Sequence, residues 1–190
     1  MSAVPAVPRF EFDGLLLTLP SPAAAGRMAT YMVRNLDRFA PSMPAPGPGF
    51  PSEAYHSGLI DRWTAEWEQG TSARLVLFEG GEEGRVVGHV SYTAISRGPL
   101  QACYLGYMLE RDHEGKGVMY EALRRSNEWV FDTLGLHRIM ANYLPANERS
   151  GRLLRRLGFQ VEGYARDYLL LGGDWKDHIL TALLNPRHGG

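Results

Sequence analysis

The segment from Asp112 to Met119, DHEGKGVM, most constrains how this chain folds, because it places two glycines between a strand-like run and an amphipathic segment. The preceding run, 103–109, is rich in aromatic and branched residues, which is typical of a buried strand. After the segment, apolar residues recur at close to helical spacing as far as Leu134. The order strand, glycine loop, helix predicts a helix N-terminus whose N–H groups and dipole suit an anion.

The two glycines of this loop, Gly115 and Gly117, favour a phosphate ligand, since a Cβ would block close approach of phosphate oxygens to the backbone. A plain left-handed turn is the alternative interpretation. The loop is not a Walker motif, because no Lys-Ser/Thr pair follows the second glycine. It is not the dinucleotide fingerprint either, because the third glycine is missing. The segment therefore predicts a site for a phosphate-bearing ligand at the start of the helix.

The second half of the chain resembles a known family. The glycine turn, the strand-like run 137–143, the helix start Asn147-x-x-Ser150 and the ending Leu157-Gly158-Phe159 resemble the GNAT superfamily of acyl-CoA-dependent N-acetyltransferases. Within it, the runs 102–107, 163–168 and 175–178 resemble the RimJ/RimL-type N-terminal acetyltransferases of ribosomal proteins, and the RimJ type most closely. The resemblance is dense over residues 86–186 and thin before them.

The fold class expected is α/β, and the whole chain, 1–190, is expected to form one N-acetyltransferase domain. Sequence patterns predict strands over 10–19, 75–78, 86–94, 102–109, 138–143, 164–171 and 176–183. They predict helices over 22–40, 52–69, 116–134 and 147–157. The resemblance implies the GNAT topology, in which helices flank a mostly antiparallel mixed sheet that is splayed between its fourth and fifth strands.

The composition argues against disulfide-rich, zinc-binding, nucleic-acid-binding and membrane-spanning proteins. The single cysteine, Cys103, rules out an intramolecular disulfide framework, and no Cys/His cluster has zinc spacing, so no metal is expected. A net charge of −1 gives no global field that favours nucleic acid. No apolar run approaches transmembrane length and no signal peptide is evident. We expect a cytoplasmic protein, monomeric or homodimeric, without a membrane or nucleic-acid partner.

The resemblance implies acetyl-CoA as co-substrate and assigns residues to it. The backbone of Met108, Leu109 and Glu110 would bind the pantetheine amides, as a neighbouring strand would. The pyrophosphate would be bound by the loop and first helical turn, which comprise Gly115, Lys116, Gly117, Val118 and Met119. Asn147 and Ser150 would face the pantetheine, and Asn147 also fits a helix cap. The superfamily usually has Gln or Arg where this chain has Asp112, which removes one side-chain contact. Lys116 fits a solvated surface position equally well.

The chemistry requires a neutral amine and a protonated leaving thiolate. An α-amino group has a pKa near 8, so a carboxylate acting directly or through one water suffices as base. Glu110 and Asp167 are the candidates, whereas Glu114 fits a helix-start carboxylate. Many superfamily members use a tyrosine as acid at the position of Leu154, which has no proton to donate. The RimJ/RimL type implies a serine in the first helical turn instead, and here that residue is Ser150.

The leading functional hypothesis is acetylation of a protein N-terminus, such as that of a ribosomal protein beginning with Ala or Ser, by direct attack in a ternary complex. One alternative is a small-molecule amine acceptor, such as an amino acid, a polyamine or an aminoglycoside. Another is an acyl-CoA-binding module without catalysis. RimJ-type enzymes carry a Pro-Trp pair after the first helix, and this chain has Pro41-Ser42, so peptide selection is expected to differ.

Overall fold

A computed structural model describes residues 5–187. The strands are β1 (Arg9–Phe12), β2 (Leu15–Thr18), β3 (Ala73–Glu79), β4 (Arg85–Ser96), β5 (Ala102–Leu109), β6 (Arg138–Tyr143), β7 (Gln160–Leu171) and β8 (Asp174–Leu184). The helices are α1 (Ala25–Phe39), α2 (Glu53–Glu68), α3 (Val118–Asp132) and α4 (Glu148–Arg156), with 3-10 turns η1 (Pro22–Ala24), η2 (Ala40–Ser42) and η3 (Arg111–His113). The strands form one sheet in the order β1-β2-β3-β4-β5-β6-β8-β7.

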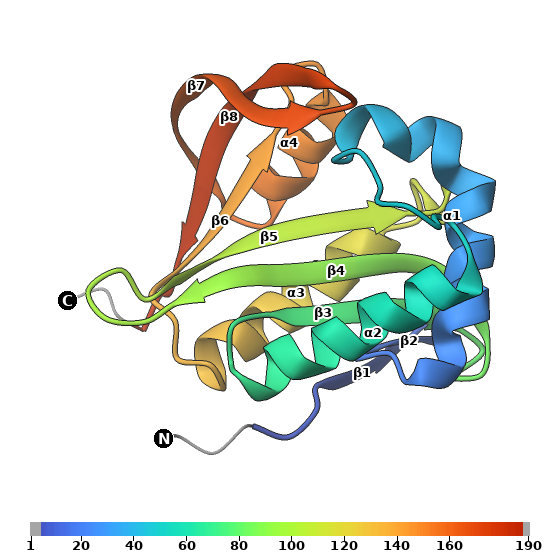
Figure 1. The fold of residues 1–190 in the computed structure, drawn as a ribbon. Helices are drawn as coiled ribbons and strands as arrows, with labels where there is room; N and C mark the ends of the chain where they lie inside the picture. Colours follow the sequence, from blue (N-terminus) through green and yellow to red (C-terminus); the bar gives the residue numbers. More distant parts are fainter. Residues whose placement is uncertain (1–4, 188–190) are drawn as a thin grey trace.

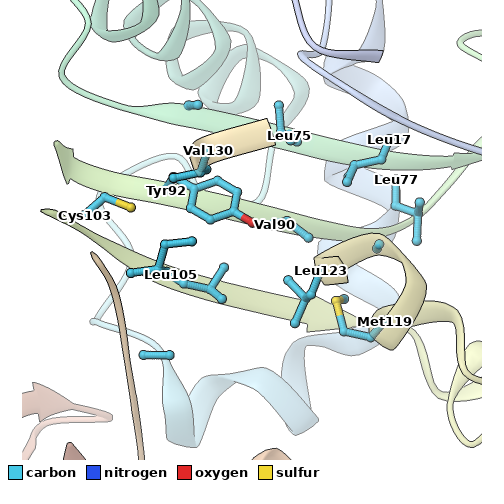
Figure 2. Close-up of a cluster of buried hydrophobic side chains, with 14 of the residues drawn as sticks. Leu17, Leu75, Leu77, Val90, Tyr92, Cys103, Leu105, Met119, Leu123 and Val130 are labelled. Atoms are coloured by element: carbon cyan, nitrogen blue, oxygen red, sulfur yellow. The ribbon is translucent and has the colours of Figure 1, made fainter. Parts of the chain in front are cut away.

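Helices cover both faces of this sheet (Figure 1). The helices α1 and α2 pack on one face, with a core that includes Tyr31, Ile60 and Phe78. The helices α3 and α4 pack on the other face, over the larger core shown in part in Figure 2. There, Leu75, Tyr92 and Leu105 of the strands meet side chains of α3 such as Leu123 and Val130. Alternation along each strand therefore decides which helical layer a side chain meets.

Among the described strands, β5 and β6 are the only neighbours that pair in parallel, and all other pairs are antiparallel. Only three residues of each strand pair, from Ala102 with Arg138 to Tyr104 with Met140. Beyond Tyr104 the two strands diverge (Figure 1). The predicted α/β fold class is confirmed. The sheet opens between β5 and β6, which are the fourth and fifth strands of the prediction because β1 and β2 were predicted as a single strand.

Several predicted elements were wrong in their bounds: β7 begins at Gln160 rather than at 164, and α1 begins at Ala25, after a 3-10 turn, rather than at 22. Two further differences have a clear local cause. The expected strand over 10–19 is a hairpin of β1 and β2, because Asp13 and Gly14 adopt positive φ angles of 48° and 73°. An Asp-Gly pair is a common hairpin turn, so the sequence carried this signal. The helix expected from Lys116 begins only at Val118, because Gly117 is the left-handed residue before it, at φ 80°.

The remaining features of the fold bear on the position of the site. Ser52 caps α2 by accepting a hydrogen bond from the Tyr55 N–H at 3.2 Å. The tip of the β7–β8 hairpin packs on η2, where the Gly172 N–H donates to the Met43 carbonyl at 3.0 Å. Cys103 is buried, and burial raises the pKa of its thiol to about 12, which fits core packing. Within residues 5–187, no helix combines the length and the apolar character that a membrane crossing requires.

Candidate active site

The opening of the sheet contains a cavity of about 990 Å³. Beyond Tyr104, the edge of β5 that faces β6 has no strand partner among the described residues, so its backbone faces the cavity. Met108 and Leu109 both line the cavity. One end of the cavity lies against the glycine loop and α4. The other end is lined by Phe39, Ser42, Asn142, Leu171 and His178. The cavity thus passes between β5 and β6 from one helical layer toward the other.

The glycine loop forms one end of the cavity. Gly115 and Gly117 both have positive φ angles, 73° and 80°, and a Cβ built at either position would meet no atom within 4 Å. Both glycines line the cavity, as do Val118 and Met119, whose side chains also pack into the core. Lys116 is exposed and does not line the cavity. The loop therefore presents open backbone at the N-terminus of α3, which suits an anion.

A row of arginines faces the glycine loop from α4. Arg149, Arg152 and Arg156 are spaced for one helical face, and all three line the cavity. Arg156 also stacks on the ring of Tyr120 from α3, 4.7 Å from the ring centroid. Together with the dipole of α3, these guanidinium groups make this end of the cavity electropositive.

The first turn of α4 presents a serine to the middle of the cavity. Asn147 caps the helix, since its Oδ1 accepts the Ser150 N–H at 3.1 Å. Ser150 Oγ lies 2.6 Å from the hydroxyl of Tyr107 on β5. The ring of Tyr143 packs against Gly151, where an added Cβ would come within 2.9 Å of the ring. The expected pair Asn147 and Ser150 is thus brought to the β5–β6 opening together with two tyrosines.

At the far end of the cavity, the lining residues Asn142 and His178 contact Tyr168, which does not itself line the cavity. The amide of Asn142 on β6 donates to the hydroxyl of Tyr168 on β7 at 3.2 Å. The ring of Tyr168 lies 5.5 Å from that of His178 on β8, and His178 is buried with Nδ1 held by the Lys176 carbonyl at 2.9 Å. Burial, and then interaction with Tyr104, raise the pKa of the Tyr168 hydroxyl. No carboxylate takes part in these contacts.

The structure does not bring the two expected carboxylate bases into the cavity. Glu110 is buried on the opposite side of β5, in ion pairs with Arg34 at 3.3 Å and Arg85 at 3.2 Å. Asp167 is exposed on β7 at φ 46°, and its N–H donates to the carboxylate of Asp177 at 2.8 Å. Neither residue lines the cavity.

The carboxylate that does line the cavity is Glu114. It pairs with Arg38 of α1 at 2.5 Å and with Arg149 of α4. Among the described residues, no group of three or more His, Cys, Asp or Glu side chains is placed to hold a metal ion.

Comparison with known proteins identifies the family. Residues 15–160 match the model of the acetyltransferase (GNAT) domain. The chain belongs to the GNAT acetyltransferase family. The N-acetyltransferase activity expected from the sequence is confirmed by this membership and by a relative in Escherichia coli (strain K12). That relative, the [ribosomal protein uS5]-alanine N-acetyltransferase, is 41% identical over 97% of this chain and 94% of its own length.

Solved structures of GNAT proteins agree. The ribosomal-protein-S5-alanine acetyltransferase of Vibrio fischeri superposes with a TM-score of 0.90 at 33% identity, over 96% of this chain and 100% of that one. RimJ of Mycobacterium smegmatis, solved with CoA-disulfide, shares the fold with a TM-score of 0.83 at 22% identity, over 97% and 89% of the two chains.

Two features of this GNAT site were missed by the sequence reasoning: Tyr107 and the arginine row. Strand parity could have found Tyr107, because Cys103, Leu105 and Tyr107 alternate on the face toward α3 and α4. Helical spacing of three and four residues could have found the arginine row.

Proposed function

We propose that the chain transfers the acetyl group of acetyl-CoA to the N-terminal α-amino group of a protein, such as a ribosomal protein beginning with Ala or Ser. The two relatives named as ribosomal-protein alanine acetyltransferases support this acceptor class, at 41% and 33% identity over nearly the whole chain. An acceptor of this kind fits a cytoplasmic enzyme. The observation that carries the proposal is a cavity with an electropositive end and no free carboxylate. We call the opposite end, lined by Asn142 and His178, the acceptor end.

The electropositive end fits the phosphates of acetyl-CoA. The open backbone at Gly115 and Gly117, the N-terminus of α3 and the arginine row are the groups that would bind the pyrophosphate. The free edge of β5 at Met108 and Leu109 would hydrogen-bond the pantetheine amides. We retain Val118, Met119, Asn147 and Ser150 as lining residues of this half. We assign Lys116 only a contribution to the local charge.

The acceptor end favours an α-amine over a polycation. Glu114 is the only acidic residue among the described residues that line the cavity, and its two carboxylate oxygens face two arginines. Without a free carboxylate, the cavity has little to attract a cation and requires an amine that is already neutral. At pH 7 about a tenth of an α-amine is neutral, whereas roughly one in 2,500 of a lysine-like amine is.

Direct attack follows from a cavity that passes through the sheet, since both substrates can bind at once. The neutral amine nitrogen attacks the thioester carbonyl carbon, and the C–N bond forms. The nitrogen then loses a proton to water, the C–S bond breaks, and Ser150 supplies a proton to the departing sulfur. Neither Glu110 nor Asp167 is needed for these steps, since the α-amine loses its first proton in solution.

Peptide acceptors test the proposal. Release of CoA thiol would be followed with peptides beginning with Ala or Ser, with the same peptides acetylated at the N-terminus but containing an internal lysine, and with spermidine. We expect turnover of the free N-termini and none of the blocked peptides. Spermidine turned over faster than every peptide would reject the protein acceptor. Tight binding of acetyl-CoA without thiol release to any amine would show a binding module instead.

A further inference from the structure

The contact between Tyr107 and Ser150 bridges the opening of the sheet. Tyr107 comes from β5 and Ser150 from the first turn of α4, and their hydroxyl oxygens lie 2.6 Å apart. Both residues line the cavity, as do the glycine loop and the residues of its far end. This contact therefore lies where the reacting thioester would be bound.

The direction of this hydrogen bond follows from what each hydroxyl requires. In the described part of the chain, Ser150 Oγ is the side-chain partner of the Tyr107 hydroxyl. A tyrosine hydroxyl withdrawn from solvent needs an acceptor for its hydrogen. Burial raises the pKa of Tyr107 to about 12, even though the hydrogen bond with Ser150 acts in the opposite direction. The phenol is therefore protonated at neutral pH. Either hydroxyl can donate at this distance, and we take Tyr107 as the donor because a phenol is a stronger acid than an alcohol. The hydrogen of Ser150 is then free to point into the cavity.

The backbone of Ser150 is fixed independently of Tyr107. Its N–H is bound by the Asn147 side chain at 3.1 Å, and the next residue, Gly151, lets the ring of Tyr143 pack directly on the helix. Glycine inside a helix lowers stability by roughly 0.5–1 kcal/mol relative to alanine, so this close packing is a specific feature of the site. Because the backbone is fixed, only the side-chain hydroxyl of Ser150 can still change its orientation.

We propose that Tyr107 is a positioning residue that orients the Ser150 hydroxyl toward the sulfur of the leaving thiolate. The inference rests on the proposed acetyl transfer, but not on the identity of the acceptor. As the C–S bond breaks and its electron pair goes to sulfur, Ser150 gives its proton to the sulfur. Ser150 then takes the proton of Tyr107, and water returns a proton to the tyrosine. No oxidant, reductant or metal is involved.

A double-mutant cycle tests this pairing. We expect Ser150→Ala to lower kcat at least tenfold, and Tyr107→Phe to lower kcat about fivefold, each with the KM for acetyl-CoA changed less than twofold. In the Ser150→Ala background, Tyr107→Phe should have no further effect on kcat, because there is no hydroxyl left to orient. Additive effects, or an unchanged kcat in Tyr107→Phe, would overturn the proposal.

The chain offers a matched control in a second tyrosine–serine pair. The hydroxyl of Tyr92 on β4 lies 2.8 Å from Ser126 Oγ and from Asn127 Oδ1, both of α3, and none of these residues lines the cavity. Tyr92→Phe removes the same kind of hydrogen bond from the core, so it should lower the melting temperature without changing kcat. If Tyr92→Phe lowers kcat as much as Tyr107→Phe, the effect is one of general stability and the proposal is rejected.

The affinity for the product CoA tests the role of Tyr107 independently of which amine is the acceptor. The Tyr107–Ser150 pair should favour a bound thiolate, so at pH 8 wild type should bind CoA several-fold more tightly than desulfo-CoA. This preference should disappear in Tyr107→Phe while desulfo-CoA affinity is unchanged. If no peptide is acetylated but the preference behaves in this way, the acceptor assignment fails and the role of Tyr107 stands. If peptides are acetylated and wild type shows no preference for CoA, the role of Tyr107 fails alone.

Discussion

Glu110 and Glu114 flank η3, four residues apart, and each is held by two arginines, one of which comes from α1. Arg34 and Arg85 bind Glu110, whose side chain is 9% exposed and lies outside the cavity. Arg38 and Arg149 bind Glu114, whose side chain is 22% exposed and lines the cavity. The first pair of contacts secures β5 to α1 and β4, whereas the second spans the electropositive end of the cavity. Similar ion pairs thus lie in two different settings, one buried beneath the sheet and one exposed to the cavity.

The largest effect is expected at Glu110. Glu110→Gln leaves Arg34 without its carboxylate partner and Arg85 with only that of Glu79. This should lower the free energy of unfolding by about 3 kcal/mol, at the lower end for a broken buried pair because both arginines are about a third exposed. Urea unfolding measures this loss. The kcat of the folded enzyme should change less than twofold. A tenfold loss of kcat with normal stability would instead make Glu110 the general base.

An exposed glutamate provides the control for this experiment. Glu82 pairs with Arg9, and both side chains are more than two-fifths exposed. Glu82→Gln should lower the free energy of unfolding by less than about 1 kcal/mol. If the two variants lose the same stability, burial is not what distinguishes Glu110.

Strand parity explains why Glu110, one of the two candidate general bases, lies outside the cavity. Met108 packs toward α1 and α2, whereas Tyr107 and Leu109 pack toward α3 and α4. Glu110 follows the parity of Met108, so it points toward α1 and away from the face covered by α3 and α4. That alternation is readable in the sequence, but the arginines that bind Glu110 come from residues 34 and 85, and only the fold brings them to it.

The parts predicted well are those specified by local chemistry. The glycine loop depends on backbone conformation, and the Asn147 cap depends on residues three apart, so both follow from short sequence patterns. The Tyr107–Ser150 contact joins residues separated by 43 positions, one on β5 and one on α4, across the opening between β5 and β6. Its existence depends on where the sheet opens, which no short pattern specifies.

The pH dependence of turnover shows whether a carboxylate of the enzyme acts as the general base or whether the amine reacts after losing its proton in solution. If no carboxylate accepts the proton, kcat/KM for an Ala-initiated peptide should rise about tenfold per pH unit below 7 and level off near pH 8, as the amine loses its proton. It should not fall again below pH 10, because Tyr107, with its pKa raised to about 12, still holds its proton there. A rate highest near pH 6 and falling above 8 would show that a carboxylate takes the proton from a bound ammonium group.

A smaller effect is expected at the glycine loop between Glu110 and α3. Gly117→Ala places a methyl group in the open space where the backbone meets the ligand, and should raise the Kd of acetyl-CoA about tenfold. Isothermal titration measures this change. The left-handed backbone at Gly117 should also lower stability by roughly 1–2 kcal/mol.

Gly80 separates backbone strain from the loss of the ligand contact. It has the same φ of 80°, its added Cβ would also meet nothing within 4 Å, and it lies outside the cavity. Gly80→Ala should therefore lose similar stability and keep its acetyl-CoA affinity. Equal losses of affinity in the two variants would reject the glycine loop as the phosphate site.

The smallest effect is expected at Glu114. Its carboxylate competes with ligand phosphates for Arg149, so Glu114→Gln should bind acetyl-CoA about threefold more tightly at low salt and lose less than about 1 kcal/mol of stability. Raising the salt concentration should reduce the gain, because it screens the freed guanidinium groups. Glu128→Gln removes the same charge from an exposed position on α3 outside the cavity, and it should leave the affinity unchanged. Weaker binding in Glu114→Gln would mean that Glu114 holds Arg38 and Arg149 in place for the ligand, and it would make both glutamates structural.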